Sequence, residues 1–310
     1  MHIQTKFAII QFGAVLWAGP MTTIQNILFP VDFSPSCTAM APYVKRAAAI
    51  TSAKVTQLYV LEPSASSGAG FELLTRPLCE VEADRECVAR AKLDSYLLSE
   101  FPPQNSSRLL VAGEAAARIA AVARERGFDL IVMPTHAGVF RRMLLGSTTA
   151  KVLNDADCPV FTTQHADTIA PRRIEHREWV CALGLTPDSE RVLRYAHRAA
   201  ETFHANLSLV HAIPAAAPGL PVQLDLEERL QSMQRQAAHD RFRELQRIVG
   251  SHASVMIAVG PIKETLIEAA RRLGADVLVI GRGSQSGAQG RLRDLTYAVV
   301  RDAPCPVLSV

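Results

Sequence analysis

Residues able to bind an anion gather in one stretch, residues 129–149 (DLIVMPTHAGVFRRMLLGSTT). Its apolar run, residues 130–133, is typical of a parallel strand that is buried on both faces. Small residues and the cationic Arg141 and Arg142 follow, and Gly146-Ser147-Thr148 has the composition of a helix start. Unpaired N–H groups and the dipole at a helix start favour an anion, and glycine lets a phosphate approach the backbone closely. The stretch therefore predicts a phosphate-binding loop.

Two alternatives apply to this stretch. Gly146-Ser147-Thr148 is also the composition of an ordinary helix cap, which needs no ligand; Arg141 and Arg142 favour phosphate binding instead. His136 titrates near neutrality and so suits acid–base chemistry, but no motif places a carboxylate or nucleophile beside it. We therefore expect no catalytic residue here.

The stretch resembles the nucleotide loop of the universal stress protein family. Gly146-Ser147 and residues 155–160 (DADCPV) fit the family pattern, whereas Pro134 and Ala137 stand where glycines are expected. The resemblance implies ATP or a related adenine nucleotide as ligand, with Mg²⁺ as the accompanying cation. It also implies a role as a nucleotide-responsive stress protein, and no protein ligand to a metal. The residues that it places at the nucleotide are Val31, Asp32, Met133, Thr135, His136, Gly138, Arg141, Arg142, Gly146, Ser147 and Thr148.

Asp32 ends the first predicted strand, and the resemblance implies that its carboxylate contacts the adenosine moiety. The family's strand order, 3-2-1-4-5, puts the carboxyl ends of strands 1 and 4 side by side at the topological switch point, where such sheets bind ligands. An aspartate at this turn can instead satisfy local N–H groups alone. The switch-point argument favours ligand contact.

Strand and helix patterns alternate along the chain, and the same series of patterns occurs twice. Asp129 and Cys158 have counterparts 147 residues later at Asp276 and Cys305, and Pro35 has one 152 residues later at Pro187. Such offsets indicate duplication, and alternating strands and helices predict parallel sheets with right-handed crossovers. With the resemblance, this predicts an α/β fold of two tandem Rossmann-like domains, each a five-stranded parallel sheet of order 3-2-1-4-5 with helices on both faces.

The predicted boundaries are an N-terminal extension at residues 1–22, a first domain at 23–163, a linker at 164–177 and a second domain at 178–310. Residues 7–18 are apolar but too short to span a membrane, which takes roughly 20 residues. They also lack a clear signal-peptide cleavage site. We interpret them as an upstream extension of a natural start at Met21, with export as the alternative.

The second copy looks degenerate as a nucleotide site. At the two offsets Gly184 replaces Asp32, Arg293 replaces Gly146 and Asp294 replaces Ser147. We therefore expect one nucleotide per chain, bound by the first domain. The opposing observations are that Arg291 and Arg293 offer phosphate contacts, and that Gly281 and Gly283 match the glycine pattern better than the first copy does.

Composition narrows the remaining functions. A net charge of +3 over 310 residues gives no electrostatic case for nucleic-acid or membrane binding. Six cysteines without a C-x-x-C pair predict reduced thiols in a cytoplasm.

A nucleotide-independent scaffold of the same fold is the second candidate function. An ATPase or adenylyl transferase is the third, although neither a Walker lysine motif nor an H-x-G-H signature is found.

Two surfaces are candidates for binding partners. An exposed last strand invites strand addition, so residues 160–162 and 307–310 are expected to pair, either in a homodimer or between the two domains of one chain. Leu226, Leu230, Met233 and Ala237 recur at helical spacing. We expect this stripe to pack against the sheet, with a partner surface as the alternative.

Overall fold

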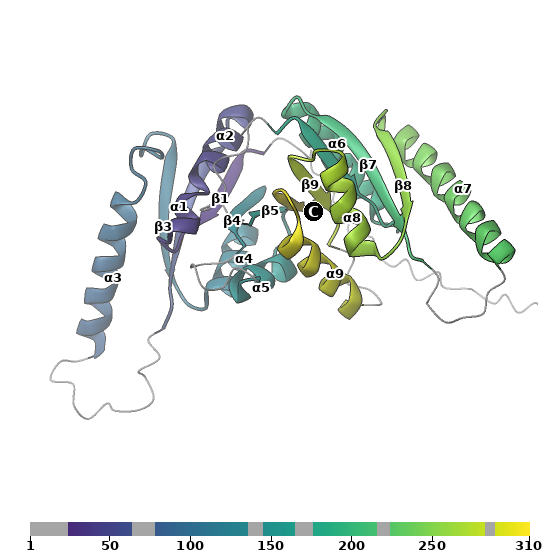
Figure 1. Ribbon diagram of the computed structural model, residues 1–310. Helices are drawn as coiled ribbons and strands as arrows, with labels where there is room; N and C mark the ends of the chain where they lie inside the picture. Colours follow the sequence, from purple (N-terminus) through teal and green to yellow (C-terminus); the bar gives the residue numbers. More distant parts are fainter. Residues whose placement is uncertain (1–23, 64–77, 136–144, 165–175, 216–223, 283–288) are drawn as a thin grey trace, which may run out of the picture.

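The computed structural model describes residues 24–63, 78–135, 145–164, 176–215, 224–282 and 289–310. Strands and helices alternate through both halves of the chain (Figure 1). In the first half the elements are β1 (Asn26–Pro30), α1 (Pro35–Thr38), α2 (Ala41–Thr51), β2 (Lys54–Leu61), α3 (Leu78–Ser95), β3 (Ser106–Ala112), α4 (Ala115–Glu125), β4 (Leu130–Pro134), α5 (Ser147–Asp155) and β5 (Val160–Thr163). In the second they are β6 (Glu178–Ala182), α6 (Ser189–Thr202), β7 (Asn206–Ile213), α7 (Leu224–Val249), β8 (Ser254–Val259), α8 (Ile262–Arg272), β9 (Val277–Ile280), α9 (Gln289–Asp302) and β10 (Val307–Ser309).

The strands form one ten-stranded sheet in the order β3-β2-β1-β4-β5-β10-β9-β6-β7-β8. Each half is parallel and has the predicted 3-2-1-4-5 order, which confirms the fold class. The two halves join through β5 and β10, which pair antiparallel. The last-strand edges therefore pair within the chain.

Helices cover both faces of this sheet, and each face has its own core. One core combines α1, α2 and α3 with α6 and α7, through side chains such as Val44, Leu193 and Phe242. The other combines α4 and α5 with α8 and α9, through Ile119, Val152 and Val299 among others. Both cores run across the junction of the two halves, so apolar burial as well as strand pairing holds the halves together.

The duplication extends to individual hydrogen bonds. The carboxylate oxygen Oδ2 of Asp129 accepts the N–H groups of Gln25 and Asn26, both at 2.9 Å. In the second half Oδ2 of Asp276 accepts those of Arg177 (2.8 Å) and Glu178 (3.0 Å). Each aspartate thus fixes the start of its domain's central strand from the loop before the fourth strand, which explains why both copies keep it.

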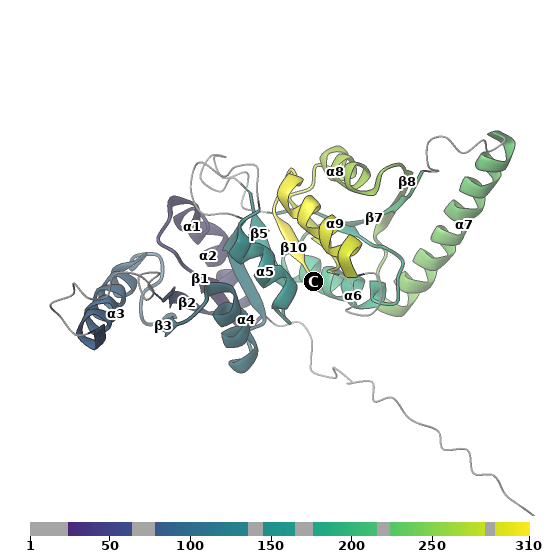
Figure 2. The same ribbon diagram turned by 90° about the horizontal axis from the view of Figure 1, so that it is seen from below.

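The apolar stripe on α7 does not pack as predicted. Leu230 is 47% exposed and Met233 68% exposed, and Ala237 is exposed too. The buried face is instead made by Ala238, Phe242 and Leu245. The reason is geometric: α7 lies at the outer end of the sheet beside β8, and only its C-terminal half reaches the core (Figures 1 and 2). The side chain of Leu226 is outside the described residues.

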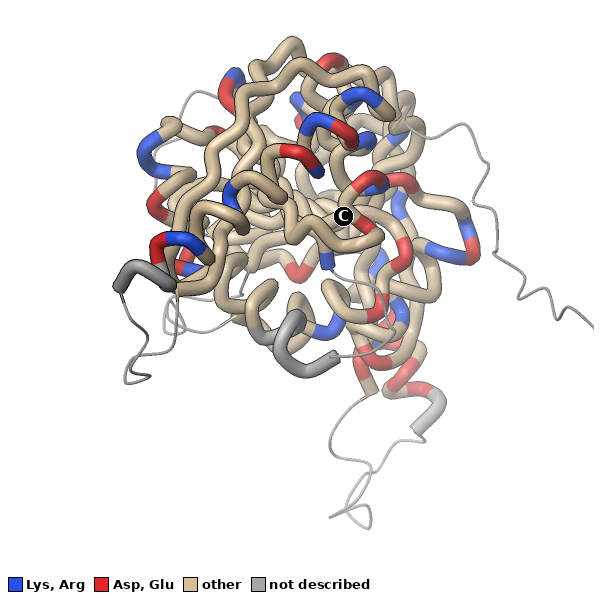
Figure 3. Tube along the Cα trace, turned by 90° about the vertical axis from the view of Figure 1, so that its right-hand side faces the viewer, with Lys and Arg blue, Asp and Glu red and all other residues tan. Residues whose placement is uncertain are grey.

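Charged residues of both signs are interspersed along the described part of the trace (Figure 3). No described helix is long and apolar enough to cross a lipid bilayer.

Candidate functional site

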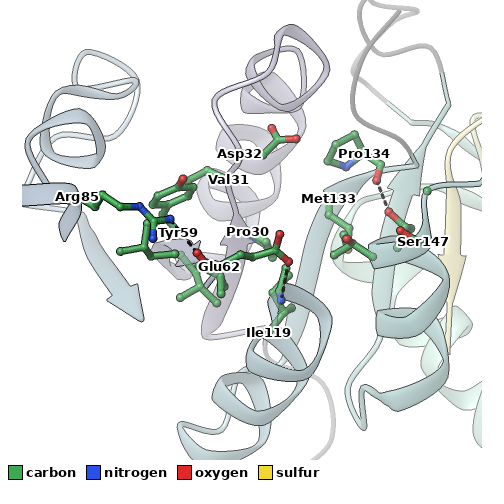
Figure 4. Close-up of a pocket in the computed structure, with 17 residues that line it drawn as sticks. Pro30, Val31, Asp32, Tyr59, Glu62, Arg85, Ile119, Met133, Pro134 and Ser147 are labelled. Carbon is green, nitrogen blue, oxygen red and sulfur yellow. Dashed lines mark hydrogen bonds between the residues drawn. The ribbon is translucent and has the colours of Figure 1, made fainter. Parts of the chain in front are cut away.

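A cavity of about 440 Å³ opens at the carboxyl ends of β1, β2 and β4 (Figure 4). This volume is in the usual range for small-molecule and cofactor sites. It lies where the strand order reverses, with β2 on one side of β1 and β4 on the other. The lining residues are Pro30, Val31, Asp32, Leu58, Tyr59, Val60, Leu61, Glu62, Arg85, Ala115, Ile119, Met133, Pro134, Gly146, Ser147, Thr148 and Thr149.

The structure brings six of the sequence-predicted site residues together in this cavity: Val31, Asp32, Met133, Gly146, Ser147 and Thr148. Four others, His136, Gly138, Arg141 and Arg142, lie outside the described residues. The remaining one, Thr135, is not among the lining residues. It is buried, and its hydroxyl donates to the carbonyl of Thr163 on β5 at 3.3 Å.

The amino end of α5 faces the cavity. Gly146 is the N-cap residue, and no side chain of the described residues makes a capping hydrogen bond to the helix. The backbone N–H of Gly146 donates to the carbonyl of Thr135 (2.8 Å), and the Thr149 hydroxyl donates to that of Pro134 (3.0 Å). These two bonds tie the helix start to the end of β4, while Ser147 and Thr148 line the cavity without capping the helix. Such an end provides N–H donors and a favourable dipole for an anion.

Asp32 is exposed at the end of β1, on the cavity wall facing β4 (Figure 4). Its Oδ1 accepts the N–H of Ser34 at 2.9 Å. Ser34 in turn caps α1, with Pro35 in the first helical position, and its hydroxyl accepts the N–H of Cys37 at 3.1 Å. Asp32 therefore does satisfy a local N–H group, as the alternative reading of the sequence expected, but this bond uses only one of its two carboxylate oxygens. A ligand role remains compatible with it.

Cys37 lies buried behind this turn. Burial, reinforced by the charge of Asp32, raises the pKa of its thiol to about 12. The thiol therefore stays protonated and unreactive at neutral pH, which agrees with a structural role.

Two charged residues of the cavity were not predicted from the sequence. Glu62 follows β2, and its Oε1 accepts the N–H of Ala115 at the start of α4 (3.2 Å). Arg85, on α3, donates from Nη2 to the carbonyl of Glu62 (2.9 Å; Figure 4). The reasoning used for Asp32 also finds Glu62, since it too ends a strand beside the switch point. No pattern separates Arg85 from the other charges on its helix.

The described lining is otherwise largely apolar. Its apolar lining residues include Val31, Leu58, Val60, Ile119 and Met133, and the charged lining residues are two carboxylates and one guanidinium. Among the described residues no group of three or more His, Cys, Asp and Glu is placed to hold a metal ion. The cavity thus combines an apolar wall, a carboxylate at a strand end and an uncapped helix start.

Sequence comparison identifies the family. The model of the universal stress protein family matches residues 23–164 and 177–310. The chain belongs to the universal stress protein family. It is therefore of a stress-response class, built as two tandem copies of the family's unit.

Individual relatives agree with this assignment. Universal stress protein A homologs 2 and 1 of Coxiella burnetii are 29% and 28% identical over 141 and 143 residues, each match covering 44% of this chain and 94% and 97% of the relative. A universal stress protein structure from Archaeoglobus fulgidus superposes with a TM-score of 0.63 at 17% identity, covering 92% of this chain and 96% of that one. A putative universal stress protein from Pseudomonas aeruginosa gives 0.60 at 19% identity, covering 93% of both chains. At these identities the structures support the fold alone.

Proposed function

We propose that this protein binds ATP or a related adenine nucleotide in its first domain, at one site per chain, and acts in the cytoplasm as a nucleotide-responsive regulator of the stress response. The observation that carries the proposal is the meeting of Asp32 and the uncapped start of α5 in one cavity at the switch point. We take residues 23–163 and 178–310 as the two domains.

Each part of a nucleotide has a counterpart in this cavity. The apolar wall formed with Val31 and Met133 suits a base, and Asp32 offers an acceptor for ribose or adenine donors. The N–H groups at Ser147 and Thr148 suit phosphates. Mg²⁺ usually binds through substrate phosphates, waters and one or two carboxylates. Under our proposal a Mg²⁺ would enter with the nucleotide, held by its phosphates and by waters.

A nucleotide-independent scaffold role is the second candidate. The observation that favours it is the charge of the described lining, where Asp32 and Glu62 outnumber Arg85 and would repel phosphates. Under our proposal Arg141 and Arg142 supply the missing positive charge.

Calorimetric titration of the purified protein with ATP tests the proposal. We expect saturable binding with one site per chain. No heat and no retention on ATP-agarose would favour the scaffold. Two equivalent sites, or binding that depends on Gly281 and not on Asp32, would refute the assignment to the first domain. Chromatography of the nucleotide after long incubation tests for turnover, which we do not expect.

A further inference from the structure

Two side chains of the second domain reach across the junction to α5, the helix that begins at the proposed phosphate end of the cavity. Arg282, just after β9, donates from Nη1 to the carbonyls of Leu153 (3.2 Å) and Ala156 (2.7 Å), and from Nη2 to that of Cys158 (2.9 Å). The hydroxyl of Tyr297, on α9, donates to the carbonyl of Ala150 at 3.1 Å. Domain two thus bonds to the middle and the C-terminal end of α5.

The second domain makes these two contacts to the first, but the equivalent residues of the first domain do not make them to the second. The residues equivalent to Arg282 and Tyr297 in the first domain are Thr135 and Ala150 (282 − 135 = 297 − 150 = 147). Backbone bonds confirm the equivalence of the first pair, since Thr135 N–H donates to Thr163 at 3.2 Å and Arg282 N–H donates to Val310 at 3.0 Å. Thr135 is too short to reach α9, and Ala150 has no hydroxyl. Of the two equivalent helices, α5 therefore receives these bonds, and α5 belongs to the domain that keeps Asp32.

The Arg282 contact is built in an unusual way. Its guanidinium is surrounded by carbonyls, and burial lowers its pKa. A buried cation is costly unless it is well bonded. Three carbonyls at a helix C-terminus, where the dipole favours positive charge, provide that bonding. Arg282 also stands where the second copy's own nucleotide loop would begin.

α5 is held at both ends. Bonds from Gly146 and Thr149 to the end of β4 tie its start, and Arg282 ties its other end. At nine residues it is only about 14 Å long, so a shift at one end moves the other.

We propose that the second domain regulates the nucleotide site of the first through α5, with Arg282 as the positioning residue and Tyr297 as its auxiliary. Arg282 thereby helps to set where the amides of Ser147 and Thr148 lie. This inference rests on the proposed function for its ligand, and its structural half can be tested without one.

The test compares four variants with the wild-type full chain. Arg282→Met removes the donors and keeps the aliphatic stem, Arg282→Lys restores a cation, and Tyr297→Phe removes only the hydroxyl. Arg301→Met is the matched control, since the described hydrogen bonds of Arg301 go to the carboxylate of its neighbour Asp302 (2.8 and 2.9 Å) and not to α5. We expect Arg282→Met to weaken ATP binding about fivefold or more, Arg282→Lys to recover part of the loss, Tyr297→Phe to cause a smaller loss, and Arg301→Met to bind as the wild type.

Amide exchange separates coupling from a purely structural role. Without nucleotide, Arg282→Met should exchange faster at Ala156, whose N–H bonds to Val152 at 2.9 Å. With ATP, the wild type should exchange more slowly at Arg282 and Val310 in the other domain, because coupling is reciprocal, and Arg282→Met should lose this response.

The outcomes are distinguishable. If the wild type binds ATP and both Arg282→Met and Tyr297→Phe keep its affinity, the inference is wrong and the proposed function stands. If the wild type binds no ATP, the proposed function fails and the regulatory role fails with it, whatever the exchange at Ala156. Should Arg282→Met not fold, Arg282→Lys and Tyr297→Phe decide: wild-type affinity in both overturns the inference.

Discussion

Phe161 and Leu308 lie opposite each other in the antiparallel pair of β5 and β10, and they are the same position of the repeat (308 − 161 = 147). The neighbours pair crosswise about them: Val160 faces Ser309, the counterpart of Thr162, and Thr162 faces Val307, the counterpart of Val160. A local two-fold axis therefore passes through this pair. It is the geometry of an isologous interface, formed here between the halves of one chain.

Removing β10 should make the protein self-associate. A chain ending at Pro306 lacks Val307, Leu308 and Val310, which are buried, and it exposes the edges of both β5 and β9. Exposed edges recruit strands from other molecules. Light scattering after size exclusion should show a larger mass than for the full chain, at equal concentration.

A deletion at the other end is the control. The repeat has no counterpart of the first 20 residues, so a chain beginning at Met21 should keep its mass per particle, its cooperative unfolding and its nucleotide affinity. An unchanged mass after loss of β10 would mean that the β5 edge is protected by something other than β10.

Asp32→Asn separates the two roles of that carboxylate. Asparagine keeps an acceptor for the N–H of Ser34, which Asp32 binds at 2.9 Å, but its second group is a donor. Loss of one acceptor for ribose or adenine costs on the order of 1–3 kcal/mol, so the dissociation constant for ATP should rise about tenfold with little change in stability. Calorimetry and thermal unfolding measure the two effects.

Asp94→Asn, an exposed carboxylate on α3 outside the cavity lining, is the control and should bind ATP as the wild type does. If Asp32→Asn and Asp94→Asn bound ATP equally well, Asp32 would have only its local role in the turn and no role in binding the nucleotide.

Gly146→Val tests the phosphate end. Gly146 has φ −61° and ψ 140°, a conformation open to any L-residue, so the variant should fold. Its side chain would stand where a phosphate meets the start of α5, and ATP binding should become undetectable or at least tenfold weaker in the same titration. A variant that binds ATP normally would remove the start of α5 from the site.

Some features of the fold and the site could be predicted from the sequence, and others depend on how the elements pack. The alternation of strands and helices and the duplication were predictable from the residues, because apolar runs and matching offsets act over whole elements. The strand order, and with it the meeting of Asp32 with Gly146, was implied by the family resemblance. Arg85 was not predictable, since its place in the cavity depends on how α3 lies against β2. The prediction that the α7 stripe packs against the sheet was wrong for a similar reason. The spacing of apolar residues identifies one face of a helix, but the position of α7 at the edge of the sheet determines how much of that face is covered.

The α7 interpretation has its own test. Met233→Ser should change the free energy of unfolding by no more than about 0.5 kcal/mol, because Met233 is 68% exposed. Phe242→Ala, on the same helix, should cost about 3–5 kcal/mol, because Phe242 is fully buried. Urea denaturation compares them. A large loss for Met233→Ser would show that a partner or a second copy covers this half of α7 in solution.

His176 should make stability depend on pH between about 6.5 and 4. It lies buried at the junction, stacked on Tyr43 at 5.6 Å between ring centroids. Burial lowers its pKa from 6.5 to about 4, with Arg46 adding to the effect and Asp276 opposing it. The unfolded chain therefore binds the proton first as pH falls, so stability decreases below about pH 6.5 and this contribution levels off below about pH 4. From pH 7 to pH 5 the expected loss is about 2 kcal/mol.

Urea unfolding at the two pH values measures this loss, and His176→Phe isolates it, because phenylalanine keeps a ring against Tyr43 and cannot titrate. The variant should lose about 2 kcal/mol less than the wild type over the same interval. His252→Gln, at an exposed position, should behave as the wild type. A wild-type pH dependence in His176→Phe would mean that other groups take up the proton, and that His176 does not cause the loss of stability at low pH.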